Sequence, residues 1–143
     1  MAKLIFNYPF MRREYLLRST ELSIGRDGSC DIAIPDYTIF SALSRSAQLL
    51  HFGDLKKISR KQARLLIKND GIYLEDTGTR GMGSTYGTYV NQGRLAVKES
   101  YLLKAGDLIR FATIQCTFME EDPAPPQAHP ILEQFFKDIS PKS

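Results

Sequence analysis

The stretch KISRKQAR at residues 57–64 places one serine among four basic side chains, and it is the first candidate for a binding site. Ser59 carries a hydroxyl group, with Lys57 two residues before it and Arg60 directly after it. A hydroxyl donor among fixed positive charges suits a doubly charged anion such as a phosphate group. An anion at Ser59 would also relieve the repulsion between the crowded cations. The alternative is a solvated basic strand that Ser59 merely begins.

Two other segments carry groups that could complete a phosphate site with Ser59. Arg26 ends the sequence SIGR at residues 23–26, and Thr85 and Tyr86 lie within STYGT at residues 84–88. Arginine and threonine side chains both donate hydrogen bonds that a phosphate oxygen can accept. Each also has an ordinary explanation, since Arg26 can be one more exposed arginine and the Thr85 hydroxyl can bind a backbone group of its own turn.

Short β-strands must position these segments, because polar and apolar residues alternate in many places along the chain. Turn signals separate the runs at intervals of about 8–12 residues, as in an all-β sandwich or barrel. The clearest is Asn69-Asp70-Gly71, in which Asp-Gly favours a hairpin turn. The expected strands are residues 4–6, 14–17, 21–24, 31–34, 63–67, 71–76, 88–91, 94–97, 101–103, 108–111 and 113–119.

Residues 37–56 interrupt this pattern with a long insertion that shows no alternation. Its apolar residues are spaced as one face of a short helix: Phe40, Leu43, Ala47 and Leu50. Ser41 is the expected helix cap. Connections of about 20 residues inside a compact domain are uncommon and are often functional. The pair Ser44-Arg45 repeats the Ser-Arg of the basic stretch, and we interpret it as a chance repeat because its spacing to the hairpin differs.

The composition indicates one intracellular domain. The 143 residues are 43% hydrophobic and 24% charged, with a net charge of +3 that does not by itself indicate nucleic acid. Cys30 and Cys116 are far apart and are expected to be reduced core thiols. No apolar run reaches the ~18–20 residues that cross a bilayer, and residues 1–9 lack the apolar region of a secretory signal. We expect a cytoplasmic protein, with a nuclear location open, and no membrane partner.

Several chemical functions find no support in the sequence. His51 and His129 lack the neighbours of a catalytic or zinc site, and no Gly-Lys-Ser/Thr follows the glycine-rich residues 78–83. We therefore expect no enzymatic activity, no metal and no cofactor. Single-stranded nucleic acid would need aromatic platforms beside the basic stretch, where only Phe52 stands, so it is the least favoured partner.

The chain changes character after residue 119. Residues 120–126 are acidic and proline-rich, which indicates a stiff linker. Beyond them, apolar residues fall on one helical face: Ile131, Leu132, Phe135, Phe136 and Ile139. We expect one domain over residues 1–119, and a linker with a short amphipathic helix over residues 120–143.

Taken in order, four motifs resemble a forkhead-associated (FHA) domain over about residues 3–119. They are SIGR at 23–26, ISRKQA at 58–63, STYGTYVN at 84–91 and LKAGDLIRF at 103–111. Each motif alone is weak, but four motifs in this order and spacing make a specific match. The resemblance implies a β-sandwich of about eleven strands whose loops at one end bind phosphothreonine peptides without catalysis.

The resemblance also implies roles for individual residues. Arg26 corresponds to the arginine of the family's Gly-Arg motif, and Ser59 to its phosphate-binding serine. Thr85 corresponds to the Thr or Ser before the family's Asn-Gly-Thr, and Lys57 to a basic residue that contacts the peptide in some members. The complete expected phosphopeptide-binding set is Arg26, Lys57, Ser59, Arg60, Thr85 and Tyr86.

Two positions depart from the family pattern. Gln62 stands where the family has a histidine that braces the loops, and Tyr86 stands where it has an asparagine that holds the peptide backbone. Glutamine can donate and accept hydrogen bonds as histidine does, whereas a phenol lacks the paired donor and acceptor of an amide. We expect a reader of phosphothreonine peptides. The alternative is a scaffold of the same fold whose phosphate site has decayed and which binds a protein through residues 37–56 or the C-terminal helix.

Overall fold

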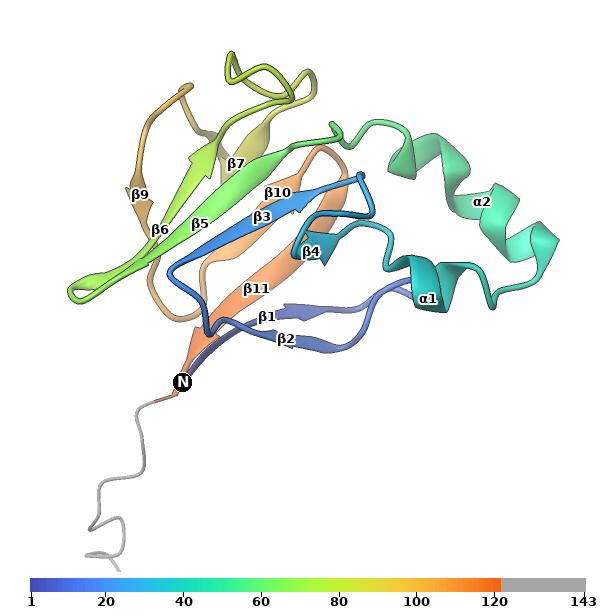
Figure 1. The fold of residues 1–143 in the computed structure, drawn as a ribbon, viewed down its shortest axis with the longest axis horizontal. Helices are drawn as coiled ribbons and strands as arrows, with labels where there is room; N and C mark the ends of the chain where they lie inside the picture. The colour runs from blue at the N-terminus through green and yellow to red at the C-terminus, as the bar shows by residue number, and fades with distance from the viewer. Residues whose placement is uncertain (122–143) are drawn as a thin grey trace, which may run out of the picture.

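The structure, a computed structural model, describes residues 1–121 and confirms the expected all-β sandwich. Eleven strands among these residues form two sheets, and two helices extend from one side (Figure 1). The strands are β1 Ala2–Phe6, β2 Glu14–Leu16, β3 Glu21–Gly25, β4 Ile32–Ala33, β5 Ala63–Lys68, β6 Gly71–Asp76, β7 Thr88–Val90, β8 Gly93–Arg94, β9 Tyr101–Leu102, β10 Leu108–Phe111 and β11 Ile114–Glu120. The helices are α1 Tyr37–Phe40 and α2 Arg45–Leu55. The expected C-terminal helix lies outside the described residues.

The two sheets differ in size and draw on both halves of the chain. One has six strands in the order β2-β1-β11-β10-β7-β8, and the other has five in the order β4-β3-β5-β6-β9. Strands β3 and β4 run parallel, whereas the other paired strands, such as β3 with β5 and β5 with β6, are antiparallel. The expected hairpin joins β5 to β6, with Lys68 paired to Gly71.

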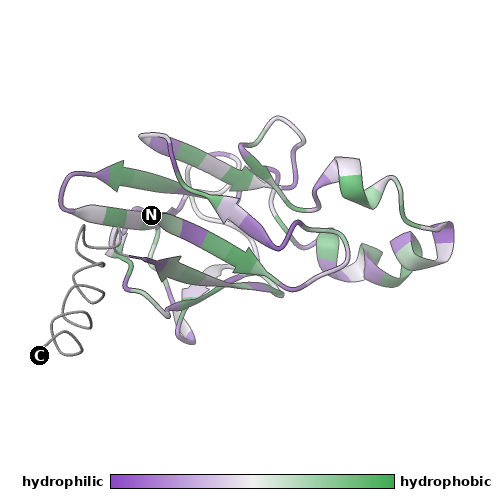
Figure 2. Cartoon of the chain, turned by 90° about the horizontal axis from the view of Figure 1, so that it is seen from below, coloured by the Kyte–Doolittle hydropathy of each residue, from purple (hydrophilic) through white to green (hydrophobic). Residues whose placement is uncertain are grey.

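Alternation along the strands builds the core between the sheets. Leu4 and Phe6 of β1 and Leu65 of β5 are buried, while Ile5 and Leu66 beside them are partly exposed. Figure 2 shows apolar and polar segments alternating along the strands. Each fully buried side chain of this kind contributes about 1.5–3 kcal/mol, which is why these runs form strands with a defined inner face.

The insertion at residues 37–56 forms two helices where the sequence predicted one. The prediction that Ser41 caps the start of the helix is wrong. Ser41 is the C-cap of α1, whereas Ser44 is the N-cap of α2, and its Oγ accepts a hydrogen bond from the N–H of Ala47 at 3.2 Å. The pair Ser44-Arg45 therefore has a structural explanation, because a serine before the first turn satisfies a free backbone donor.

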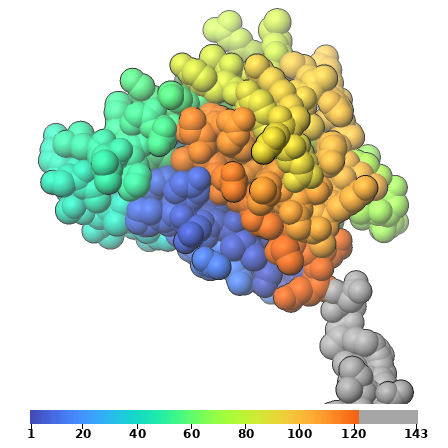
Figure 3. Space-filling model, turned by 180° about the vertical axis from the view of Figure 1, so that it is seen from behind, coloured from blue at the N-terminus to red at the C-terminus, as the bar shows by residue number. Residues whose placement is uncertain are grey.

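Helix α2 packs only weakly against the sandwich. It projects from one side of the molecule, as the ribbon and the rear view both show (Figures 1 and 3). Leu55 is its one buried residue. Leu49, Leu50 and Phe52 are exposed, which leaves apolar surface on the helix without a partner among residues 1–121.

The strand predicted at residues 94–97 is shorter in the structure. Pairing ends with β8, and Val97 makes only an isolated bridge to Asp76. The N–H of Ala96 bonds to the Glu99 carboxylate at 2.9 Å instead of to a neighbouring strand. This local turn removes a backbone donor that a longer strand would need.

The part of the basic stretch that precedes residue 63 is not a strand. Residues 58–62 form a turn, and β5 begins at Ala63. The N–H of Ser59 bonds to the side chain of Gln62 at 2.9 Å, within the turn itself. The alternative of a solvated strand beginning at Ser59 is therefore wrong, because this donor serves the loop and not a sheet.

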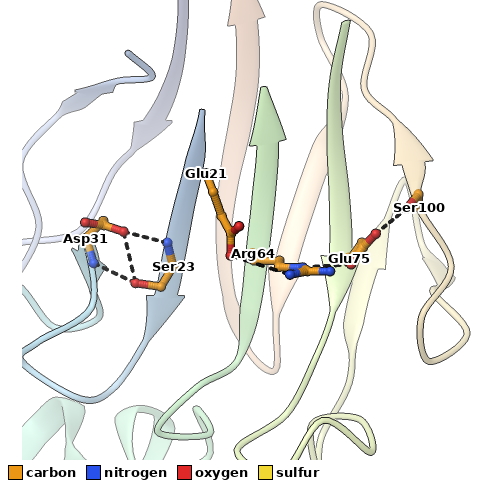
Figure 4. Close-up of polar contacts among 6 residues, drawn as sticks. All are labelled: Glu21, Ser23, Asp31, Arg64, Glu75 and Ser100. Carbon is orange, nitrogen blue, oxygen red and sulfur yellow. Dashed lines mark hydrogen bonds and ion pairs between the residues drawn. The ribbon is translucent and has the colours of Figure 1, made fainter. Parts of the chain in front are cut away.

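The outer face of the five-stranded sheet carries a row of polar contacts (Figure 4). Arg64 on β5 lies 3.5 Å from Glu21 on β3 and 2.8 Å from Glu75 on β6. Ser100 also donates a hydrogen bond to Glu75. Partial burial raises the pKa of Glu75, but the bonds from Ser100 and Arg64 outweigh this and hold the pKa below its ordinary value. The row links three neighbouring strands, so we assign it to the stability of the sheet.

Candidate functional site

Three loops meet at one end of the sandwich because of the strand register. Ile24 near the end of β3 pairs with Ala63 at the start of β5, and Ala63 pairs with Asp76 at the end of β6. The segments that leave β3, enter β5 and leave β6 therefore begin side by side. Along these segments lie Arg26, Ser59 and Thr85.

Gly25 allows the first two loops to touch. A Cβ atom at residue 25 would lie 2.1 Å from the carbonyl oxygen of Arg60, a distance that no side chain tolerates. In this close approach, Arg26 donates its backbone N–H to the carbonyl of Ser59 at 3.0 Å, and Asp27 donates to that of Arg60 at 3.2 Å. The glycine before Arg26 is thus explained by packing of backbone against backbone.

The Arg26 side chain is fixed at its inner end and open at its tip. Its Nε donates to the carbonyl of Ile58 at 2.9 Å, and the hydroxyl of Tyr37 holds the Arg26 carbonyl at 2.6 Å. Within residues 1–121, no carboxylate forms an ion pair with Arg26. The terminal guanidinium nitrogens are therefore available to an anion.

Ser59 and Thr85 join the second loop to the third. The N–H of Thr85 lies 3.4 Å from Ser59 Oγ, a long hydrogen bond between residues that are 26 positions apart. Ser59 is partly buried and Thr85 is exposed. Together with the bond from the Arg26 N–H to the Ser59 carbonyl, this contact brings the loops that carry Arg26, Ser59 and Thr85 next to one another.

Gln62 lies beneath this site and is completely buried. Its Oε1 accepts the N–H of Ser59 at 2.9 Å, and its Nε2 donates to the carbonyl of Gly87 at 2.9 Å and to Thr88 Oγ1 at 3.0 Å. Its backbone N–H bonds to the carbonyl of Ile24 at 2.8 Å. Gln62 thus ties together all three segments that form the site.

Asp76 anchors the third loop in a similar way, although the sequence analysis did not single it out. It is buried, and it accepts hydrogen bonds from the N–H of Ser84 at 3.1 Å, from Ser84 Oγ at 2.6 Å and from Thr88 Oγ1 at 2.7 Å. The available signal was a carboxylate at the end of an apolar strand, followed by a loop rich in Ser and Thr. Charged residues are rarely buried without such partners.

A family model for the FHA domain matches residues 22–112, well over half of the chain. The chain belongs to the FHA domain family. The match includes Arg26, Ser59 and Thr85 together with the two residues that brace their loops, Gln62 and Asp76.

Solved structures of FHA domains share this fold at low sequence identity. The N-terminal FHA domain of Rad53p from S. cerevisiae, solved in complex with a phosphothreonine peptide, is 16% identical with a TM-score of 0.61, over 85% of this chain and 94% of that one. The FHA domain of the CT664 protein from Chlamydia trachomatis is 20% identical with a TM-score of 0.60, over 85% and 98%. An FHA domain from work on phosphothreonine-dependent interactions is 20% identical with a TM-score of 0.61, over 85% and 98%. No curated protein sequence matches the chain.

Lys57 and Tyr86 face each other at the rim of the site in this FHA domain. The Lys57 Nζ lies 5.9 Å from the centre of the Tyr86 ring, within the range of a cation–π contact. Tyr86 is 51% exposed. An exposed aromatic ring therefore stands at the position that is asparagine in the family pattern.

The site is electropositive. Besides Arg26, the cations on the three loops include Lys57, Arg60, Lys61 and Arg80, and none of these forms an ion pair within residues 1–121. The one acidic residue beside Arg26 in the chain, Asp27, is turned into its own loop. Hydrogen bonds from the backbone and hydroxyl of Ser29, at 3.0 Å each, lower its pKa. A cluster of positive charges without acidic partners attracts a multiply charged anion.

The predicted site residues thus differ in how the structure places them. Arg26, Ser59 and Thr85 are linked directly through their loops, and Lys57 and Tyr86 lie on the rim. Arg60 contributes its carbonyl group to the Asp27 contact, while its side chain is exposed. Among the described residues, no group of His, Cys, Asp and Glu could hold a metal ion, and neither helix has the length and apolar character that spanning a bilayer requires.

Proposed function

We propose that this FHA domain is a non-catalytic module that recognises phosphothreonine peptides and mediates phosphorylation-dependent protein–protein interaction. The observation that carries the proposal is the hydrogen bond between the N–H of Thr85 and Ser59 Oγ, beside the loop of Arg26. It brings donors from three loops to one place that is rich in unpaired cations. A phosphate group, with its double charge and three acceptor oxygens, matches that arrangement.

Each residue then has a distinct role. Arg26 donates charge-assisted hydrogen bonds to the phosphate, and the hydroxyl groups of Ser59 and Thr85 donate further ones. Lys57 and Arg60 attract the phosphate and the flanking peptide, and Tyr86 lies against the peptide backbone. The complex of the Rad53p FHA domain with a phosphothreonine peptide supports the class of ligand by analogy of fold.

The partner is accordingly a protein or peptide phosphorylated on threonine. We place the interaction inside the cell, in the cytoplasm or the nucleus. Both cysteines, Cys30 and Cys116, are free and buried, and free thiols persist in these reducing compartments.

Calorimetric titration with matched peptides tests the proposal. We expect a phosphothreonine peptide selected from a library to bind, and its unphosphorylated twin to bind much more weakly. Arg26→Ala removes charge-assisted bonds worth roughly 1.5–3 kcal/mol, so it should weaken binding about tenfold or more. Arg18→Ala, which changes an exposed arginine before β3 and far from the Arg26 loop along that strand, is the matched control. Equal binding of the two peptides would contradict the proposal.

A scaffold that binds protein without phosphate is the second candidate. Two observations favour it: the exposed apolar residues on α2, and Tyr86 in place of the family's asparagine. It predicts that Arg26→Ala leaves capture of a cellular partner intact, whereas serine at Leu49, Leu50 and Phe52 together abolishes it. A pull-down with the opposite pattern would exclude this candidate.

A further inference from the structure

A small apolar pocket opens between α1 and α2, beside the proposed phosphate site. Its volume is about 190 Å³. Its walls are largely apolar and come from Pro35, Tyr37, Phe40, Phe52 and Leu55. An apolar cavity of about 150 Å³ can hold a benzene ring, so this pocket has room for one large aliphatic or aromatic side chain.

Arg26 belongs to both the pocket and the phosphate site. Its side chain lines the pocket, while its Nε is held by the carbonyl of Ile58, directly before Ser59. Tyr37 forms another wall and donates its hydroxyl to the Arg26 carbonyl at 2.6 Å. Arg26 is therefore common to both places, so a ligand that Arg26 binds lies next to the pocket.

The pocket is built from side chains that differ in burial. Leu55 is buried, whereas Phe52 is 58% exposed. Contact between an apolar group and a ring with this exposure is favourable, because it removes water from the face of the ring. The pocket is thus lined by a buried residue at Leu55, and the exposed ring of Phe52 is accessible to a ligand.

The charges around the pocket identify the kind of ligand. Lys56 lines the pocket, with its Nζ 6.0 Å from the centre of the Phe52 ring, and Arg26 adds a second positive charge to the lining. An apolar group on a chain that also carries negative charge matches this surface. A second copy of this chain would bring the same cations to the contact and be repelled.

We propose that the pocket between α1 and α2 receives a large apolar side chain of the phosphothreonine peptide, such as leucine, from a position close to the phosphothreonine. The inference rests on the proposed function and adds a sequence preference to it. Three extended residues span about 10 Å, so a position within three residues of the phosphothreonine can reach past Arg26 into the pocket. The helical insertion at residues 37–56 is then a specificity element.

The experiment uses phosphothreonine peptides in which leucine, alanine or aspartate occupies, in turn, each of the three positions before and after the phosphothreonine. Every peptide has an unphosphorylated twin, and binding is measured by calorimetry. We expect one position at which the leucine peptide binds about tenfold more tightly than the alanine peptide, as burial of one large apolar side chain predicts. Aspartate at that position should bind no better than alanine.

Two variants of α2 assign this preference to the pocket. Phe52→Ala removes an exposed wall and should abolish most of the leucine preference, while the preference for phosphorylated peptides remains. Leu50→Ala is the matched control, because Leu50 is 77% exposed on the same helix and does not line the pocket. It should leave both preferences unchanged, and circular dichroism checks that both variants keep their helices.

The outcomes separate this inference from the proposed function. If phosphorylated peptides bind more tightly but no position prefers leucine, or if the preference survives in Phe52→Ala, the pocket inference fails alone. If phosphorylated and unphosphorylated peptides bind equally, both the proposed function and the pocket inference are contradicted. A dimer in sedimentation velocity that Phe52→Ala dissociates would assign the pocket to a second copy and overturn the inference.

Discussion

Gln62 and Gly87 are hydrogen-bonded across the base of the proposed phosphate site, with Nε2 of the glutamine donating to the glycine carbonyl at 2.9 Å. The two residues are 25 positions apart and belong to different loops. The same side chain accepts the N–H of Ser59, so one buried amide positions both sides of the site. Glutamine can do this because it offers a donor and an acceptor at once. The family pattern has a histidine there, which has the same two capacities.

Replacing Gln62 should therefore destabilise the domain and weaken ligand binding together. Gln62→Leu leaves the N–H of Ser59 without its partner and removes two bonds to the third loop, so we expect a loss of about 3 kcal/mol in the free energy of unfolding. Urea denaturation measures the loss, and calorimetry measures phosphopeptide affinity. Gln62→His is the control and should lose less of both. A Gln62→Leu variant with unchanged stability would contradict the bracing role.

Gly25 should resist replacement for a steric reason. In Gly25→Ala, the added Cβ would meet the Arg60 carbonyl at 2.1 Å, so the Arg26 and Ser59 loops must separate. We expect phosphopeptide affinity to fall about tenfold or more, by the loss of a charge-assisted contact.

Gly53→Ala provides the matched control for Gly25→Ala. A Cβ at Gly53 in α2 meets nothing within 4 Å, and alanine favours a helix over glycine by up to about 1 kcal/mol. This variant should bind phosphopeptide normally and unfold at the same or a slightly higher urea concentration. If both glycine variants bound alike, the close approach of the two loops would not matter for function.

Asp76 should be intolerant even of asparagine. All three of its hydrogen bonds come from donors on Ser84 and Thr88, and an amide NH₂ group would point a donor at one of them. We expect Asp76→Asn to lose about 2 kcal/mol in the free energy of unfolding and to bind phosphopeptide more weakly. Asp70→Asn, at the exposed tip of the β5–β6 hairpin, is the control and should change stability by less than about 1 kcal/mol. Equal effects of the two substitutions would contradict the anchoring role of Asp76.

Stability should depend on pH through Glu75. Partial burial raises its pKa, but hydrogen bonds from Ser100 and Arg64 prevail and hold the pKa below the ordinary value of 4.5. A carboxyl group with a lowered folded pKa stabilises the fold fully above its unfolded pKa, and this contribution is lost as the pH falls through the folded pKa. Glu75→Gln lacks the contribution at every pH.

The measurement for Glu75 is urea unfolding of both proteins from about pH 6 to about pH 3. The wild type should be the more stable protein near pH 6, and the difference should shrink steadily below about pH 4.5. A difference that stays constant over this range would show that the charge of Glu75 contributes nothing.

Much of the fold follows from the sequence because strand signals are local. Alternation of apolar residues along runs such as residues 63–67 decides which face is buried, and an Asp-Gly pair is enough to indicate a hairpin. The candidate site is partly local too, since Ser59 and its cations lie within one short stretch. The errors also have local causes: Ser41 and Ser44 are equally good caps in sequence, and only the path of the chain after α1 selects Ser44.

The sequence by itself determined the all-β class, the succession of strands along the chain and the residue types that could bind phosphate. Only the tertiary structure decided which buried groups hold the three loops together and where the helical insertion lies. Gln62, Asp76 and the pocket beside Arg26 depend on contacts between residues far apart in the chain. The physical reason is that the spacing of apolar residues along a strand reports which side chains are buried. A hydrogen-bond partner in another loop is instead set by the register of the strands that connect the two loops.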